Sequence, residues 1–204
     1  MDDALVYLSD VDSHIRELIE QYPRPSFLPH KNYYQELASS IISQQLSVKA
    51  AATIEGRFKD LFGGDFPSPD QILTKDIEEL RSVGLSRPKA GYIQDLAKKV
   101  LDGTVDFSTI DSLSNQEIID ELTKVKGIGE WTVHMFMMFC VGRPDVLPIG
   151  DLGIKNGMHA LYHLDEKPTP EEMTALAEKN HWHPYETVAS WYIWHSLDNK
   201  PAIS

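Results

Sequence analysis

KVKGIGEWTVHMFMMFCVGRPDVLPIGDLGIK, from Lys124 to Lys155, decides the fold class of this chain and its candidate chemistry. Two glycines stand close together early in this stretch, a long apolar run follows, and a proline-containing loop ends at Asp151. With the preceding SNQEIIDEL, the pattern predicts a helix, a tight turn over Val125–Gly129, and a second, apolar helix from about Glu130. The glycines permit positive φ, and the amides at the start of the second helix point outward with its positive dipole end. Such a turn can seat an anion, but an ordinary turn between two core helices fits the same pattern.

Helical periodicity extends over the rest of the chain. Apolar residues recur three and four positions apart, and no long alternating run indicates a strand. Capping-box patterns begin at Ser68, Ser114 and Thr169, and clusters of proline and glycine separate the periodic segments. The predicted fold class is therefore all-α, with about ten short helices joined by loops of ordinary length.

Length and composition limit the class of protein. The chain has 204 residues, 42% of them hydrophobic, which is enough to bury the core of a single domain. No apolar run reaches about 18 residues, and the acidic start MDDALVYLSDVDSH lacks the pattern of a signal peptide. We therefore expect no membrane span and a cytoplasmic protein, or a nuclear one in a eukaryote. The only cysteine, Cys140, lies in an apolar run, which argues against a disulfide or cysteine-bound metal and predicts core packing.

The net charge of −12, from 31 acidic and 19 basic residues, argues against nonspecific binding of nucleic acid. A binding face can still be basic locally while the acids lie elsewhere on the surface. Six basic residues fall at or near the predicted helix starts and turns: Lys49, Arg87, Lys89, Lys124, Lys126 and Lys155.

Several motifs in one order resemble the helix-hairpin-helix DNA glycosylase superfamily, in particular its alkylation-repair branch, 3-methyladenine DNA glycosylase II. The likeness runs from YYQELASSIISQQLSVKAA through GLSRPKAGYIQDLA, KGIGEWT and LPIGDLGIK to PYETVASWYIWH, which is nearly the whole chain. It implies an all-helical fold of two lobes with the active site in the cleft between them. We expect one glycosylase domain over residues 1–204, with approximate lobes 31–145, containing the hairpin 118–141, and 1–30 plus 146–204.

The resemblance also implies an activity. Members hydrolyse the N-glycosidic bond of alkylated purines, such as 3-methyladenine and 7-methylguanine, in duplex DNA after flipping the base out. The expected partner is double-stranded DNA with alkylated bases, and one active site on one small domain makes a monomer the default. Two alternatives remain: a damaged-DNA-binding module without catalysis, and a glycosylase for other lesions such as ethenoadenine or oxidised bases.

Asp151 matches the catalytic aspartate of the family. At a helix start the dipole favours a carboxylate anion, which can stabilise the positive sugar that develops as the bond breaks and can orient water. Taken alone, an aspartate at this position is more often a simple N-cap. Asp145, the nearest other carboxylate, matches a loop acid and is interpreted as structural.

Aromatic residues are expected to form the base pocket, because a methylated purine already carries positive charge and stacks well on aromatic rings. The resemblance assigns Trp131 and Trp194 to the pocket, with Met135 and Tyr185 beside them. Met135 stands where some relatives carry tyrosine, so the pocket shape differs there. Trp131 also occupies the place of the lysine nucleophile that relatives with lyase activity use, which predicts a monofunctional glycosylase.

The remaining assignments concern DNA contacts and a cation. The turn SQQLS is the wedge region of the family, with Gln45 expected to fill the gap left by the flipped base and Leu46 or Ser47 as alternatives. Gln44 belongs to the same turn, but a buried amide network joining helices explains it equally well. No cofactor is expected to be required, although the hairpin of the family holds Na⁺ or K⁺ through main-chain carbonyls. The predicted DNA-binding residues are Ser47, Lys49, Lys89, Lys126, Gly127, Ile128 and Gly129, and the predicted carbonyl ligands are those of Thr123, Val125 and Ile128.

Overall fold

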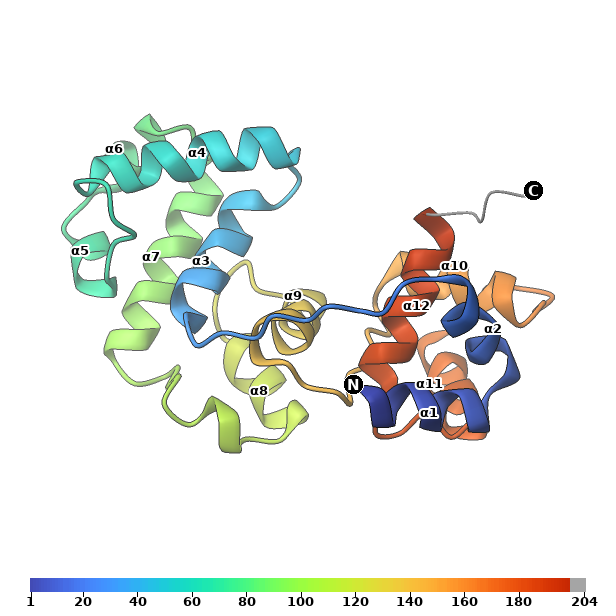
Figure 1. The fold of residues 1–204 in the computed structure, drawn as a ribbon. Helices are drawn as coiled ribbons and strands as arrows, with labels where there is room; N and C mark the ends of the chain where they lie inside the picture. Colours follow the sequence, from blue (N-terminus) through green and yellow to red (C-terminus); the bar gives the residue numbers. More distant parts are fainter. Residues whose placement is uncertain (199–204) are drawn as a thin grey trace. The chain divides into compact units, whose positions relative to one another are not determined.

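A computed structural model describes residues 1–198 and confirms the all-α prediction, since those residues contain helices and no strand. The chain forms two compact units. The central unit comprises His30–Phe136, and the terminal unit combines Met1–Pro29 with the segment from Met137 onward. Figure 1 shows both units, coloured along the sequence. Within residues 1–198, no helix is both long and apolar enough to cross a membrane.

The central unit is built around α7 (Arg87–Leu101), the longest of its helices. Helix α7 packs against α3 (Tyr33–Ser43), α5 (Pro69–Leu73) and α6 (Ile77–Ser82), and Figure 1 shows α3 and α7 side by side. Its fully buried face includes Ile93 and Leu96, which turn towards the core of the unit. The other elements of the unit are α4 (Val48–Leu61), η1 (Ile110–Ser112), α8 (Asn115–Leu122) and α9 (Glu130–Met135).

The terminal unit is organised around α12 (Glu186–Asp198), which packs against α1 (Asp2–Val11), α2 (Ser13–Gln21) and α10 (Leu152–Leu161). Apolar residues occur all around α12, as expected of a helix enclosed by neighbours. The unit also contains α11 (Pro170–Lys179) and all of the π-helix η2 (Phe136–Val141) except Phe136, which belongs to the central unit. Its core includes Leu8, Ile15, Met158, Trp182 and Ile193.

A buried carboxylate ties the N-terminal helices to the rest of the terminal unit. Asp12 is 2% exposed and caps α2 by accepting hydrogen bonds from the amides of His14 and Ile15. Its Oδ2 also accepts the indole N–H of Trp182 at 2.8 Å and the hydroxyl of Tyr162. A buried carboxylate is tolerated when donors surround it in this way, so α1 and α2 are fixed to residues far along the sequence.

The helix starts predicted from sequence are confirmed. Capping boxes form at Ser68, Ser114 and Thr169, and Ser47 and Asp151 cap α4 and α10. The predicted helix-turn-helix of the hairpin consists of α8, the turn after Leu122, and α9, which begins at Glu130 as expected.

Residues 137–145, which the sequence prediction grouped with the hairpin, pack in the terminal unit. Phe139 stacks on Trp194 of α12, and Gly142, at φ +83°, lies against Pro29, whose Cγ would be 2.5 Å from an added Cβ. Cys140 is 1% exposed, which confirms its role in core packing. That residues 1–204 act as one glycosylase domain stays a prediction.

Candidate active site

Asp151 is held in one orientation by two donors. As the N-cap of α10, its Oδ1 accepts the amide N–H of Ile154 at 2.8 Å, and the same oxygen accepts the indole N–H of Trp194 at 2.7 Å. The residue is partly exposed, so the carboxylate lies at the surface of the terminal unit. The predicted N-cap is thus confirmed, and the structure adds a second partner that a simple cap does not need. A carboxylate with fixed geometry is suited to stabilise positive charge on a bound molecule.

The position of Asp151 depends on close packing of α10 on α12. Gly153 and Gly157, four residues apart, face α12. A Cβ at Gly157 would lie 2.2 Å from Cγ2 of Ile193, and one at Gly153 would lie 2.9 Å from both Asp151 Oδ1 and Trp194 Cδ1. Two glycines on one helix face therefore let the start of α10 reach the indole. The spacing of the two glycines in DLGIKNG is the signal from which this close packing could have been predicted.

The loop that leads to Asp151 is anchored to the first turn of α12. Thr187 is 2% exposed, and its hydroxyl donates to the carbonyl of Arg143 at 2.7 Å and accepts the amide of Val146 at 3.2 Å. Its own amide donates to the carbonyl of Pro144 at 2.9 Å. Thr187 and Trp194 are two helical turns apart, so one face of α12 holds both the loop and the carboxylate.

An aromatic wall stands beside Asp151. The rings of Trp194 and Phe139 stack with centroids 6.1 Å apart, and Phe27 lies 5.9 Å beyond Phe139. Phe139 is 40% exposed although it belongs to a very apolar run. The sequence gives no sign of this position, because a phenylalanine within MFMMFCV is typical of core packing, and its exposure is visible only in the fold.

The other predicted pocket residues lie in different surroundings. Trp131, at the start of α9 in the central unit, is 47% exposed, and Met135 in the same helix is partly buried. Tyr185 packs its ring edge against Tyr7, with centroids 5.5 Å apart, at the margin of the terminal core. The contacts of Tyr185 favour a packing role, and the pocket roles of all three residues stay predictions.

The two glycines of the hairpin turn differ in their surroundings. Gly127 has φ +82°, and a Cβ there would lie 2.1 Å from the ring of Tyr92 in α7. A Cβ on Gly129 would meet nothing within 4 Å. Gly129 therefore leaves open room at the start of α9, where a phosphate group is predicted to approach.

The carbonyls predicted to hold a monovalent cation belong to this turn. Val125 and Ile128 are 0% and 4% exposed, so their side chains anchor the turn in the central unit. The carbonyl of Val125 accepts the amide of Ile128 at 3.1 Å, which leaves a second lone pair for an ion. Carbonyl oxygens are suitable ligands for a hard cation, and the site over Thr123, Val125 and Ile128 stays a prediction.

The wedge turn is hydrogen bonded to the hairpin turn. Gln44, the C-cap of α3, donates from Nε2 to the carbonyl of Gly127 at 2.8 Å. Gln44 is only partly buried and this bond is exposed, so the amide joins the two elements without forming the buried network that was the alternative interpretation. Gln45 is exposed and has φ +57°, a left-handed conformation that few residues other than glycine adopt. Leu46 is 38% exposed, and Ser47 begins α4. Gln45 and Leu46 thus form the tip of the turn.

The basic residues predicted to bind DNA have unequal surroundings. Lys49 and Lys126 are exposed on α4 and on the hairpin turn. Arg87 forms an ion pair with Glu78. Lys89 is engaged within the unit: its Nζ donates to the carbonyls of Ile42 at 2.8 Å and Gln44 at 2.6 Å.

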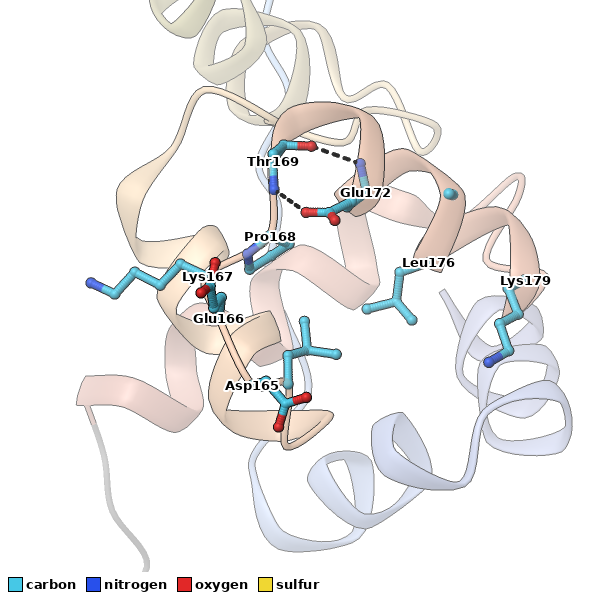
Figure 2. Close-up of a pocket in the computed structure, with 10 residues that line it drawn as sticks. Asp165, Glu166, Lys167, Pro168, Thr169, Glu172, Leu176 and Lys179 are labelled. Atoms are coloured by element: carbon cyan, nitrogen blue, oxygen red, sulfur yellow. Dashed lines mark hydrogen bonds between the residues drawn. The ribbon is translucent and has the colours of Figure 1, made fainter.

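A surface pocket of the terminal unit, shown in Figure 2, lies apart from the predicted residues. It lies between the loop from Leu164 to Pro168 and helix α11. At its edge, the amide of Thr169 donates to Glu172 at 2.7 Å, and the amide of Glu172 donates back to the Thr169 hydroxyl. These polar groups satisfy one another as a helix start, so we assign no chemistry to this pocket.

Comparison with known proteins gives consistent results. Residues 38–181 match the family described as HhH-GPD superfamily base excision DNA repair protein. The chain is 36% identical to DNA-3-methyladenine glycosylase 1 of Schizosaccharomyces pombe, over 94% of this chain and 85% of that protein. A solved S. pombe 3-methyladenine DNA glycosylase in complex with abasic DNA has a TM-score of 0.82 and 34% identity, covering 99% of this chain and 100% of that one. For a DNA-3-methyladenine glycosidase of Bacillus halodurans the TM-score is 0.84 with 38% identity, over 93% and 86% of the two chains.

Proposed function

Because the chain belongs to the HhH-GPD superfamily of base excision DNA repair proteins, we propose that it is a glycosylase that removes alkylated purines from duplex DNA. Its reaction is hydrolysis of the bond between the base and deoxyribose, after the damaged nucleotide has left the helical stack. The similarity to relatives named for 3-methyladenine supports this substrate class.

The observation that carries the proposal is the fixed carboxylate of Asp151 beside an aromatic wall. As the N-glycosidic bond lengthens, positive charge develops on the sugar, and the carboxylate stabilises it and orients the attacking water. Its two donors, the amide of Ile154 and the indole of Trp194, keep the oxygen in place without reorganisation during the reaction. The rings of Trp194 and Phe139 offer faces on which a cationic purine can stack.

A single carboxylate is sufficient for this substrate class. A purine methylated at N3 or N7 carries a positive charge before cleavage and departs as a neutral base, so it needs little help from a proton donor. Neutral lesions such as oxidised guanine leave poorly without such a donor. We therefore expect cationic purines to be released much faster than neutral ones.

The proposed enzyme cleaves no DNA strand. A strand-cleaving glycosylase attacks the sugar with an amine nucleophile, and the resemblance assigns the position of that lysine to Trp131. An indole cannot form the Schiff base. Sodium borohydride should therefore trap no covalent complex with the protein, and a trapped complex would contradict this part of the proposal.

The test is base release from a duplex with one 7-methylguanine, followed under single-turnover conditions. Asp151→Asn should abolish release while binding to a duplex with a tetrahydrofuran abasic-site analogue is kept. Asp145→Asn is the matched control, because it removes a carboxylate from the same loop and should leave release intact. Wild-type release by Asp151→Asn would overturn the mechanism, and binding without release by the wild type would identify a damage-recognition module.

Substrate range is measured in parallel on 3-methyladenine, 7-methylguanine, ethenoadenine and oxidised guanine. The proposal predicts that the two cationic purines react first. Fastest release of oxidised guanine would refute the assignment to alkylated purines.

A further inference from the structure

One face of α7 supports both elements that are predicted to touch DNA. Lys89, Tyr92 and Asp95 are three residues apart and so share that face. Lys89 contacts the wedge turn, and the ring of Tyr92 underlies Gly127. Asp95 accepts the amide of Lys126 at 2.8 Å. Wedge and hairpin are distant in sequence, yet the same helix positions both.

The ammonium of Lys89 is hydrogen bonded within the central unit, at the C-terminal end of α3, whereas a lysine that contacts DNA would point its ammonium at a phosphate. Its ammonium donates to the carbonyls of Ile42 and Gln44, at the helix end where unpaired carbonyls carry the negative end of the dipole. These two hydrogen bonds compensate the ammonium of Lys89 for the water that it loses on partial burial. Partial burial lowers the pKa of Lys89 from its ordinary value, which fits an ammonium withdrawn from solvent.

Gln44 closes the connection between the two elements. Its main-chain carbonyl accepts a hydrogen bond from the ammonium of Lys89, and its side-chain amide donates one to the carbonyl of Gly127. The carbonyl and the side chain of Gln44 are thus both hydrogen bonded. The next residue, Gln45, has a left-handed conformation and is the exposed tip of the turn. Lys89 and Gln44 thus hold the tip at a fixed distance from the hairpin.

We propose that Lys89 is a positioning residue for base flipping, which fixes the wedge turn relative to the hairpin, and that it does not bind a DNA phosphate. This inference rests on the proposed function and on the wedge role that the resemblance assigns to the tip, which is to enter the base stack. Insertion requires that neighbouring bases be unstacked, and a mobile turn would add the entropy cost of ordering it. A tip held in place before DNA arrives avoids that second cost.

Two readouts separate a positioning lysine from a phosphate contact. The first is the salt dependence of binding, whose slope falls by about 0.9 for each phosphate contact removed. The second is the fluorescence of 2-aminopurine beside a tetrahydrofuran abasic-site analogue, which rises when the inserted tip unstacks the neighbouring base. Both use an unreactive duplex, so they remain informative even if the wild type releases no methylated purine, the result that would refute the proposed function.

Three lysine-to-methionine variants remove the same charge from different places. Lys89→Met removes the internal contact, Lys49→Met removes an exposed charge predicted to face phosphate, and Lys98→Met removes an exposed charge elsewhere on α7. Lys89→Met should keep the salt slope of the wild type but lose about tenfold or more in the rate of the fluorescence rise, as expected when a contacting group is misplaced. Lys49→Met should lower the slope, and Lys98→Met should change neither the slope nor the fluorescence rise.

Single-stranded substrate provides a further check, since it requires no wedge. Lys89→Met should release 7-methylguanine from single-stranded DNA as fast as the wild type, and the loss should appear in the duplex alone. Equal losses on both substrates, in a variant with the folded fraction of the wild type, would place the defect outside the wedge turn and overturn the inference.

Gln44→Met tests the same connection without changing charge. It should reduce insertion, and the double variant with Lys89→Met should be less impaired than the product of the single effects, because both residues hold one turn. If Lys89→Met lowers the folded fraction seen in thermal unfolding, Gln44→Met carries the test instead. A reduced salt slope with wild-type insertion in Lys89→Met would show a phosphate contact and refute the proposal.

Discussion

Replacing Trp194 by phenylalanine isolates the hydrogen bond that orients Asp151. The substitution removes the indole N–H that donates to Oδ1 at 2.7 Å but leaves an aromatic ring to stack on Phe139. The second donor, the amide of Ile154, is a main-chain group and stays. Any change in catalysis then reports on the orientation and hydrogen bonding of the carboxylate.

The size of the effect follows from the charge of the acceptor. A hydrogen bond to a charged group contributes about 1.5–3 kcal/mol, and each 1.4 kcal/mol of lost transition-state stabilisation slows a reaction about tenfold. Because Asp151 and Trp194 are only partly buried, we expect the lower half of that range. Trp194→Phe should therefore slow base release about ten- to fortyfold.

The assay is single-turnover release of 7-methylguanine from a duplex, combined with binding to a tetrahydrofuran-containing duplex. The rate should fall while the dissociation constant stays within about twofold, since the lost interaction acts mainly in the transition state. Trp191→Phe is the matched control, because Trp191 lies in the same helix and stacks on His195 with centroids 4.6 Å apart. A wild-type rate in Trp194→Phe, or an equal loss in Trp191→Phe, would refute the orienting role.

Three predictions concern stability. Gly157→Ala should lower the free energy of unfolding by about 1–3 kcal/mol through overpacking against Ile193, whereas Gly56→Ala, in an open helical position, should be neutral or stabilising in the same urea titration. Asp12→Ala should cost about 2–4 kcal/mol, because it removes a helix cap and leaves the buried indole of Trp182 and the partly buried phenol of Tyr162 without their acceptor. No change in the unfolding midpoint would contradict this. Burial lowers the pKa of His134 from its ordinary value of 6.5, and the charge of Glu130 partly opposes this shift. As the pH falls, the unfolded state therefore binds the proton before the folded state does, so the free energy of unfolding should decrease between about pH 7 and pH 5. In His134→Gln this dependence should weaken, and an unchanged pH profile would exclude His134 as its source.

Local patterns in the sequence were sufficient to predict the all-α class, the helix starts and the hairpin, but not the π-helix η2. Capping residues such as Ser114 and Thr169 act on amides within one turn of themselves, so their effect can be predicted without knowledge of the fold. The hairpin could be predicted for the same reason, since Gly127 takes the positive φ that a tight turn requires. Asp151 as an N-cap is equally local, and the order of the motifs then led to the catalytic role proposed for it.

The tertiary contacts of those residues could not be predicted in this way, because the contacting groups come from distant parts of the chain. Sequence placed Lys89 at a helix start and so suggested a phosphate contact, but the fold brings it to two carbonyls at the end of α3. Phe139 belongs to an apolar run and is nevertheless exposed beside Trp194. Periodicity and capping depend on neighbours a few residues away, whereas the direction of a side chain and its partner depend on how helices pack. The sequence alone therefore determined the helices, the turn and the candidate acid, and only the tertiary structure decided which groups hold that acid and the wedge in place.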